Sequence, residues 1–396
     1  MSQAPLQALS HALDERRVLV VCGAGGVGKT TIAAALGVQA AIRGRRVLVC
    51  TIDPSRRLAT SLGLDRLPDH PRELELARVS PDRDRRGALW AMTLDTKRTF
   101  DAIVEKHAAT EAARRRILEN RFYQQVSAAL AGSHEYMAME KLLELSADER
   151  FDLVILDTPP TRHALDFLEA PDRLMGFLDT SILRWFLKPY FAAGRLTLRV
   201  ATRTGAMALK LADRVLGLQF LQDLSEFFLA FEGMYAGFKV RAGRVRALLH
   251  SHDAGFVIVA SPAPLTLDEA VFFHRRLDQS GMPFVAFVVN RVHPDPAQGF
   301  APTRAAADVD DDLAQALVEV FQDQKRLARS DRRSVERLEG LTGEKALLVP
   351  EFEADVHNLA ELKETGDVMF GTAGGRRGRG RARSTHRLAT AERKSG

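Results

Sequence analysis

The sequence predicts an α/β protein built on a doubly wound, mainly parallel β-sheet that carries an inserted α-helical subdomain. Short segments that are apolar throughout recur along the chain, as expected for strands covered on both faces. Helical segments separate most of these strands, which favours parallel pairing. Two long stretches, at about residues 96–150 and 170–250, are helical in pattern and interrupt that alternation.

Each predicted strand and helix has a local signal. The segment KTTIAAALGVQAAIRG predicts a helix that starts at Lys29 and stops at Gly44, because glycine favours helix C-termini. Thr266, followed by Glu269 three residues later, reads as a capping box and predicts a helix start. The predicted strands begin at Arg17, Arg45, Phe151, Ala254, Pro283 and Lys345.

Charge is distributed unevenly along the 396 residues, whose formal net charge is +5. Residues 371–396 hold eight Lys or Arg and one Glu, a net +7, which leaves −2 for the remainder. This tail has almost no large apolar side chains, so we expect it to be disordered beyond a domain spanning residues 1–370. Nucleic-acid or acidic membrane contact through the tail is the weaker alternative, because no aromatic residue is interleaved with its arginines.

Composition also excludes several classes of protein. No apolar run reaches about 18 residues, so no transmembrane helix is expected, and the N-terminus lacks a secretory signal pattern. The two cysteines, Cys22 and Cys50, lie in predicted buried strands. We interpret them as core residues of a protein in the reducing cytoplasm, not as a disulfide or a metal site.

The residues after the first strand read GAGGVGKT and fit the phosphate-binding pattern G-x-x-x-x-G-K-T. Loop amides and the following helix N-terminus bind anions, the lysine neutralises phosphate charge, and the Thr30 hydroxyl can ligate Mg²⁺. A glycine-rich turn without a ligand is the alternative, which the strand–loop–helix context disfavours. The expected nucleotide-binding residues here are Gly23, Gly25, Gly26, Val27, Gly28, Lys29, Thr30 and Thr31.

Two aspartates follow other predicted strands and should reach the same sheet edge. Asp157 ends the segment LVILD and is expected to hold Mg²⁺ together with Thr30, directly or through water. Asp53 is expected to orient or deprotonate the attacking water. Its alternative is a helix N-cap, since Pro54 follows it. With Lys29, these two aspartates form the predicted catalytic set.

The motifs together resemble one known family. GAGGVGKTT, TIDPSRRLATSLG, LWAMTLDTKRTFDA, LDTPPTRHALDFLEAP and FVVNRVHP occur in the order seen in the arsenical pump-driving, or anion-transporting, ATPases. That family is related to the ATPase that targets tail-anchored membrane proteins. The resemblance spans about residues 17–360 and implies a P-loop NTPase fold, ATP and Mg²⁺ as ligands, and a nucleotide-gated dimer. A single loop motif implies a homodimer.

The resemblance also implies roles for particular residues. Asp53 matches the switch I aspartate that activates water, and residues 157–163 match switch II, which senses the γ-phosphate. Asn290 matches the asparagine that reads adenine, a base whose recognition needs both a donor and an acceptor. Pro350, within VPEFEADV, matches the segment that passes the other side of the base.

The sequence departs from the family in three ways. Ala24 stands where a lysine normally reaches the partner's nucleotide, and we hypothesise that Arg162, or else Arg56 and Arg57, supplies that charge. C-x-x-C is absent, so the zinc of the targeting branch is not expected. There is no cysteine cluster, and thiolates are the natural ligands of arsenite. Arsenite transport is therefore not expected.

Two functions follow from these observations. The first is an Mg²⁺-dependent ATPase that moves its helical subdomain to handle an apolar helix of a client or membrane-associated partner. A broad apolar stripe could line such a groove, or could equally be subdomain core or dimer contact. The second is a scaffold that binds nucleotide but barely hydrolyses it. This function stays possible because Ala24 replaces the lysine that normally reaches the partner's nucleotide. The stripe consists of Phe220, Leu221, Leu224, Phe227, Phe228, Phe231, Met234, Tyr235 and Phe238.

Overall fold

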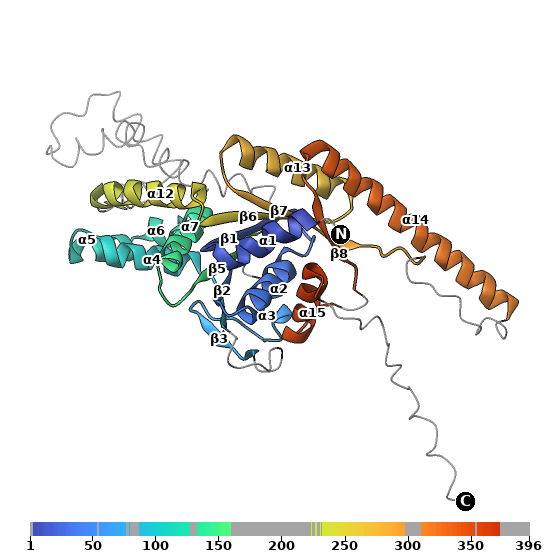
Figure 1. Ribbon diagram of the computed structural model, residues 1–396. Helices are drawn as coiled ribbons and strands as arrows, with labels where there is room; N and C mark the ends of the chain where they lie inside the picture. Colours follow the sequence, from blue (N-terminus) through green and yellow to red (C-terminus); the bar gives the residue numbers. More distant parts are fainter. Residues whose placement is uncertain are drawn as a thin grey trace, which may run out of the picture.

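The computed structural model places a central twisted sheet between two layers of helices (Figure 1). A helical subdomain lies beside one end of the sheet and a long helix extends from the other. The structure describes residues 3–53, 55–76, 79, 87–126, 133–159, 223, 226, 227, 230, 232–297, 310–352 and 355–372.

Within these residues the sheet has eight strands in the order β3-β4-β2-β5-β1-β6-β7-β8. All neighbouring pairs are parallel except β3 with β4, so the predicted mainly parallel, doubly wound sheet is confirmed. The strands are β1 Val18–Gly23, β2 Arg46–Thr51, β3 Arg72–Leu74, β4 Ala88–Thr93, β5 Leu153–Asp157, β6 Ala254–Ala260, β7 Phe284–Val292 and β8 Ala346–Pro350. Sequence patterns missed β3 and β4.

The helices are α1 Gln3–Glu15, α2 Lys29–Ile42, α3 Arg57–Ser61, α4 Thr96–His107, α5 Glu111–Leu118, α6 Arg121–Val126, α7 Ser133–Ser146, α12 Tyr235–His250, α13 Pro264–Gln279, α14 Asp311–Thr342 and α15 Leu359–Phe370. The predicted start of α13 at Thr266 is wrong. This helix begins at Pro264, whose fixed φ suits the first turn. The Thr266 hydroxyl instead donates to the Ser261 and Ala263 carbonyls.

Alternate residues of the central strands feed two separate cores, as a sheet covered on both faces requires. Leu19 and Val21 pack with α1, α2 and α15 on one face. Val18, Val20 and Cys22 pack on the other face with α4, α7, α12, α13 and the C-terminal half of α14. Cys22 and Cys50 are free and buried, and burial raises the pKa of both thiols, that of Cys50 to about 12.

The helical subdomain has an aromatic core. Phe100 of α4 lies 5.2 Å from the Tyr123 ring, and Tyr123 stacks on Phe227 at 5.9 Å. Phe227, Met234 and Phe238 of the predicted apolar stripe are all buried in this core. The other members of the stripe lie outside the described residues, or, for Tyr235, have an undescribed side chain. The described part of the stripe is therefore core.

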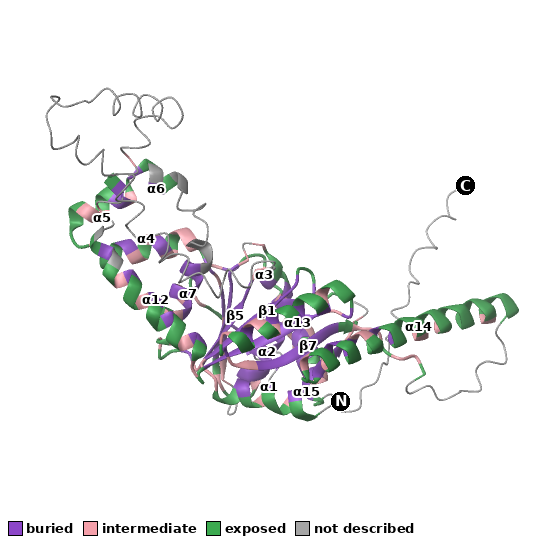
Figure 2. Ribbon diagram, turned by 90° about the horizontal axis from the view of Figure 1, so that it is seen from above, coloured by how far each residue is buried: buried purple, intermediate pink, exposed green. Residues whose placement is uncertain are grey.

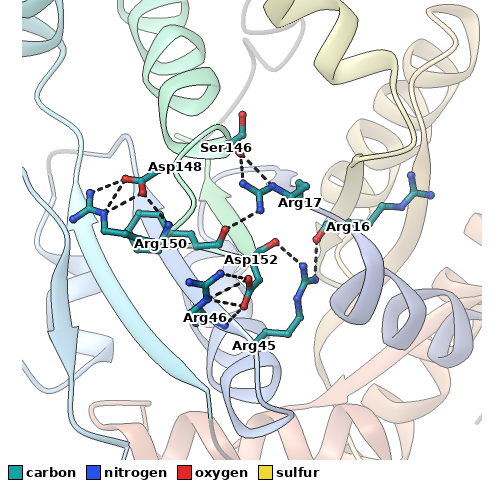
Figure 3. Close-up of polar contacts among 9 residues, drawn as sticks. Arg16, Arg17, Arg45, Arg46, Ser146, Asp148, Arg150 and Asp152 are labelled. Carbon is teal, nitrogen blue, oxygen red and sulfur yellow. Dashed lines mark hydrogen bonds and ion pairs between the residues drawn. The ribbon is translucent and has the colours of Figure 1, made fainter.

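Arginine side chains form hydrogen bonds and ion pairs at the amino edge of the sheet, where β1, β2 and β5 begin (Figure 3). Arg45 donates to the Leu13 carbonyl at 2.6 Å, the Arg16 carbonyl at 2.8 Å and the Asp152 carbonyl at 2.5 Å. Arg46 forms an ion pair with the Asp152 carboxylate at 2.7 Å. The Arg45 bonds satisfy carbonyl oxygens near the end of α1 and just before β1 and β5.

Three expectations lie largely outside the described residues. They are the helical stretch at about residues 170–250, described only at 223, 226, 227, 230 and 232–250, the basic tail, of which only residues 371 and 372 are described, and residues 160–163 of switch II, including Arg162. In the part of the chain that is described, no helix combines the length and apolarity needed to cross a membrane.

Candidate functional site

The phosphate-binding loop joins β1 to α2 and needs glycine at two positions. A Cβ at Gly23 would lie 1.9 Å from the Val259 carbonyl oxygen on β6, closer than any real contact. Gly28 has φ +91°, and a Cβ there would lie 2.3 Å from the Asn290 amide nitrogen. Both glycines therefore let the loop pack against its neighbours in a conformation that other residues resist.

Lys29 is the first residue of α2 and its side chain is buried under the loop. Its ammonium donates to the carbonyl oxygens of Gly23 at 2.9 Å and Ala24 at 2.7 Å. Burial lowers the pKa of Lys29, and the nearby Asp157 carboxylate opposes that shift. A buried cation beside a glycine-rich loop at a helix N-terminus is suited to a polyphosphate.

Asp157 ends β5, in register with Val21 of β1 and Thr51 of β2, so it lies beside the loop. Thr30 and Thr51 both donate to its Oδ2, at 2.8 and 2.9 Å. Its Oδ1 is buried with no hydrogen-bond partner among the described residues. Burial raises the pKa of Asp157 to about 6, against the lowering effect of the two hydroxyl donors.

This arrangement fits Mg²⁺. A buried carboxylate oxygen without a partner costs free energy unless a cation or donor reaches it. Carboxylate and hydroxyl oxygens are the hard ligands that Mg²⁺ prefers, and Thr30 supplies the hydroxyl on the same side of the loop. The residues present could therefore hold the ion, directly or through water, beside bound phosphates.

Asp53 lies just past β2 and lines the same cavity. Its Oδ1 accepts from the Ser55 backbone amide at 2.8 Å, and its Oδ2 lies 3.8 Å from the Arg57 guanidinium. The following helix α3 has Arg56 as its N-cap residue, so the alternative of Asp53 as that helix's N-cap is wrong. The side chain is held in a short turn at the cavity wall.

The cavity at this edge has a volume of about 550 Å³. It is lined by Gly26, Gly28, Lys29, Thr30, Thr31, Asp53, Arg56, Arg57, Thr60, Ser61, Thr158, Arg291, Asp355, Val356 and His357. Of the other predicted residues, Pro350 ends β8 opposite Val292, outside this lining. Gly23, Gly25 and Val27 shape the loop without lining the cavity.

Asn290 and Arg291 share an irregularity in β7. The pairing with β8 shifts register between Val289 and Val292, and Arg291 has φ +61°. Among the described residues Arg291 is the one non-glycine residue with positive φ, an unfavourable conformation for a long side chain. The bulge turns Asn290 inward, where its amide donates to the Val27 carbonyl at 2.9 Å, and Arg291 outward into the cavity.

Sequence reasoning missed Arg291 and His357 as lining residues, and it reached Asp355 and Val356 only through the family resemblance, as part of VPEFEADV. Arg291 directly follows the predicted Asn290, which was its only signal in the sequence. Asp355, Val356 and His357 approach from the segment between β8 and α15, and the resemblance, not a local pattern, placed VPEFEADV beside the base.

Comparison with known proteins supplies the family. A model described as anion-transporting ATPase matches residues 16–330, most of the chain. The chain belongs to this family. An arsenical pump-driving ATPase of Aquifex aeolicus is 26% identical over 70% of this chain and 64% of its own length. The ATPase GET3C of Arabidopsis thaliana is 24% identical over 72% of this chain and 68% of its own.

A third relative, an arsenical pump-driving ATPase of Halobacterium salinarum, is 30% identical over 43% of this chain but only 26% of its own length. The match to the Aquifex and Halobacterium proteins thus spans less than two-thirds of each of them. Family membership agrees with the loop, the two strand-end aspartates and the mainly parallel sheet.

Proposed function

We propose that this member of the anion-transporting ATPase family binds Mg·ATP at the carboxyl edge of its sheet and hydrolyses the terminal phosphate. The single observation that carries this proposal is the polarised environment of Asp157. Two hydroxyls hold one carboxylate oxygen while the other is buried without a partner among the described residues, beside the phosphate-binding loop. A folded protein retains such a group where a ligand completes it.

The side chains divide the work of hydrolysis. The loop amides and Lys29 hold the β- and γ-phosphates and stabilise the charge that develops on the leaving group. Mg²⁺, when bound at Thr30 and Asp157, neutralises charge on the phosphate oxygens. Asp53 orients the attacking water and accepts its proton, with the Ser55 amide fixing the carboxylate.

Adenine is the base we propose, recognised through Asn290. Its amide nitrogen is engaged by the Val27 carbonyl, so its side-chain oxygen is the group left to accept from an exocyclic amine. Adenine presents such a donor beside an acceptor. Arg291 and Val356 line the cavity nearby, and Pro350 is proposed to lie beyond the base.

We propose that the protein works as a nucleotide-gated homodimer in the cytoplasm. Ala24 carries no charge to a partner's nucleotide, and its side chain is buried. Arg56 and Arg57 line the cavity, which supports their supplying that charge, whereas Arg162 lies outside the described residues. An apolar helix of a client or partner protein is the cargo that the family resemblance implies.

Arsenite is not part of the proposal. Cys22 and Cys50 are buried in the sheet core, and burial raises the pKa of both thiols. A thiol that stays protonated inside a packed core is a poor ligand for a metalloid. No zinc is proposed either, because the chain lacks the paired cysteines for it.

A nucleotide-dependent scaffold with little turnover is the second candidate, and Ala24 favours it. Phosphate release tests the choice, measured with Mg·ATP and Mg·GTP on the wild type and on Asp53→Asn. Asp65→Asn, an exposed aspartate outside the cavity lining, is the matched control. ATP turnover that survives in the control and falls by about 10²–10⁴ in Asp53→Asn supports the ATPase.

ATP binding is measured on the same samples by calorimetry. Wild-type protein that binds ATP but releases no more phosphate than Asp53→Asn would favour the scaffold. Equal turnover in Asp53→Asn and the wild type would exclude Asp53 as the base. Failure of all forms to bind either nucleotide would overturn the proposal as a whole.

A further inference from the structure

Among the residues that the structure describes, the body of the protein packs on helix α14 through the C-terminal half of this helix. Val335 and Leu338 are buried in the core under the sheet, and Arg337 pairs with Asp268 of α13 at 2.9 Å. From residue 311 to 327, by contrast, hardly any side chain is buried. This overhang, residues 311–327, extends away from the body for roughly 25 Å at 1.5 Å per residue (Figures 1 and 2).

The overhang carries an apolar stripe on the side that α14 uses to pack on the body. Leu317 and Val335 are eighteen residues apart, as are Val320 and Leu338. Eighteen residues are five full turns at 3.6 residues per turn, so each exposed residue lies in line with a buried one. The packing face therefore continues past the last part of the body that covers it.

We call Leu313, Leu317, Val320 and Leu327 the seam. Their steps of four, three and seven follow the heptad spacing of helices that pack against another helix. They are 53%, 55%, 58% and 43% exposed, respectively. Four large apolar side chains in one line are more than scattered surface residues and mark a contact.

Charge along α14 indicates what covers the seam. Residues 310–323 hold five acids and no base: Asp310, Asp311, Asp312, Glu319 and Asp323. Residues 324–337 hold six bases against two acids, the bases being Lys325, Arg326, Arg329, Arg332, Arg333 and Arg337. Two such helices repel when parallel and attract when antiparallel, because each acidic half then meets a basic half.

We propose that the seam docks on the seam of a second copy of this chain, with the two α14 helices antiparallel and crossing near Val320. In that register Leu313 of one copy faces Leu327 of the other, and the acidic residues 311 and 312 face the partner's basic second half. The pairing gives the proposed homodimer an interface that requires neither nucleotide nor metal. The seam pairing depends on the proposed function in one respect: both proposals require the protein to form a dimer.

Light scattering of the nucleotide-free full chain at micromolar concentrations tests the pairing. The wild type is expected to be a dimer, and Leu317→Asp to associate at least about tenfold more weakly, because it places a charge in a packed apolar contact. Val318→Asp is the matched control. Val318 is 53% exposed, nearly the same as Leu317, but lies about 100° further around the helix, off the seam.

Both variants change exposed positions, so both should fold, and thermal unfolding by circular dichroism checks this. A monomeric wild type, or equal loss of the dimer in Leu317→Asp and Val318→Asp, would overturn the proposal. Phosphate release is assayed separately. A wild type that is monomeric and hydrolyses ATP would contradict the seam pairing and leave the ATPase proposal standing. A dimer that shows no ATP turnover would contradict the ATPase proposal and leave the seam pairing standing.

Cysteine cross-linking tests the direction of the pairing. The chain's own Cys22 and Cys50 are buried, so they give little background. Val320→Cys should form a covalent dimer under mild oxidation, since the two copies of residue 320 meet at the crossing. Leu313→Cys alone should not, because its neighbour is Leu327. Cross-linking of Leu313→Cys as fast as Val320→Cys indicates parallel helices and contradicts the antiparallel register.

Discussion

The two ends of strands β1, β2 and β5 differ in whether their charged side chains have hydrogen-bond partners within the protein. At the amino edge, Arg45 by itself donates to three backbone carbonyls, of which those of Arg16 and Asp152 are drawn in Figure 3. At the carboxyl edge, a buried oxygen of Asp157 has no partner among the described residues, and Thr30, which donates to the other oxygen, lines a cavity of about 550 Å³. Charge that the protein satisfies itself stabilises the fold, whereas charge left short of partners at a cavity is available to a ligand.

The largest expected effect is on activity, at the carboxyl edge. Lys29→Ala should lower phosphate release by about 10²–10³, because it removes a preorganised cation from the developing phosphate charge. Its own hydrogen bonds go to the buried carbonyls of Gly23 and Ala24. Urea unfolding without nucleotide should therefore show a loss of about 1–3 kcal/mol in the free energy of unfolding, and phosphate release is compared per folded molecule. Unaltered phosphate release in Lys29→Ala would contradict the assignment.

Asp157→Asn should stabilise the nucleotide-free protein. The folded-state pKa of Asp157, about 6, lies above its ordinary value of 3.8, so between these pH values the folded protein holds a proton that the unfolded chain has lost. This group therefore lowers the free energy of unfolding as pH rises from about 4 to 6, and the deficit persists above pH 6. At 1.36 kcal/mol per unit of pKa, it amounts to about 3 kcal/mol at most.

Urea unfolding of the wild type and Asp157→Asn between pH 4 and 8 measures this difference. The variant should be the more stable form at pH 7 and should lose stabilisation by Mg·ATP, since it no longer supplies a carboxylate to the ion. A variant that is less stable than the wild type across the whole range would mean that Asp157 serves the fold.

At the amino edge the expected pattern is reversed. Arg45→Met should lower the free energy of unfolding by about 2 kcal/mol, because it leaves three partly buried carbonyls without their donor. Phosphate release per folded molecule should be unchanged. Arg46→Gln, which removes an ion pair at the exposed rim of the same cluster, is the control and should shift the unfolding midpoint less. Equal effects of the two changes would argue against carbonyl bonding as the source.

The smallest effect is a gain in stability. Arg291→Gly should raise the free energy of unfolding by up to about 1 kcal/mol, because glycine adopts φ +61° freely but also gives the unfolded chain more freedom. Thermal unfolding measures it. A loss of more than 1 kcal/mol would mean that the arginine side chain holds the bulge together.

The buried centre of the fold could be predicted from sequence. Each of the six predicted strands starts within two residues of its observed position, because unbroken apolar runs identify strands covered on both faces. The sequence analysis did not predict β3 and β4, and the reasons are physical. Residues 72–74 are mostly exposed, and β4 is half-exposed at Trp90 near the sheet's rim. Both strands are stabilised by hydrogen-bonded pairing with neighbouring strands, and the local sequence gives no signal of that pairing.

The candidate site divides in the same way. Lys29, Thr30, Asp53 and Asp157 follow from strand ends and loop spacing, which are local. Asp355 and Val356 were reached only through the family resemblance. The contribution of Arg291 depends on a register shift between β7 and β8, and that of His357 on where the segment after β8 runs. Such positions follow from the packing of distant segments, so single-sequence reasoning does not reach them.

The burial of α2 has a consequence for motion. Lys29 and every residue from Ile32 to Ala41 are buried, so this helix is wedged between the sheet and α15 and has no room to tilt. Because α2 begins directly after the phosphate-binding loop, we expect this packed helix to hold the loop in place while nucleotide enters and leaves. Among the described residues that line the cavity, the exposed turn around Arg56 and Arg57 can move without disturbing a packed core.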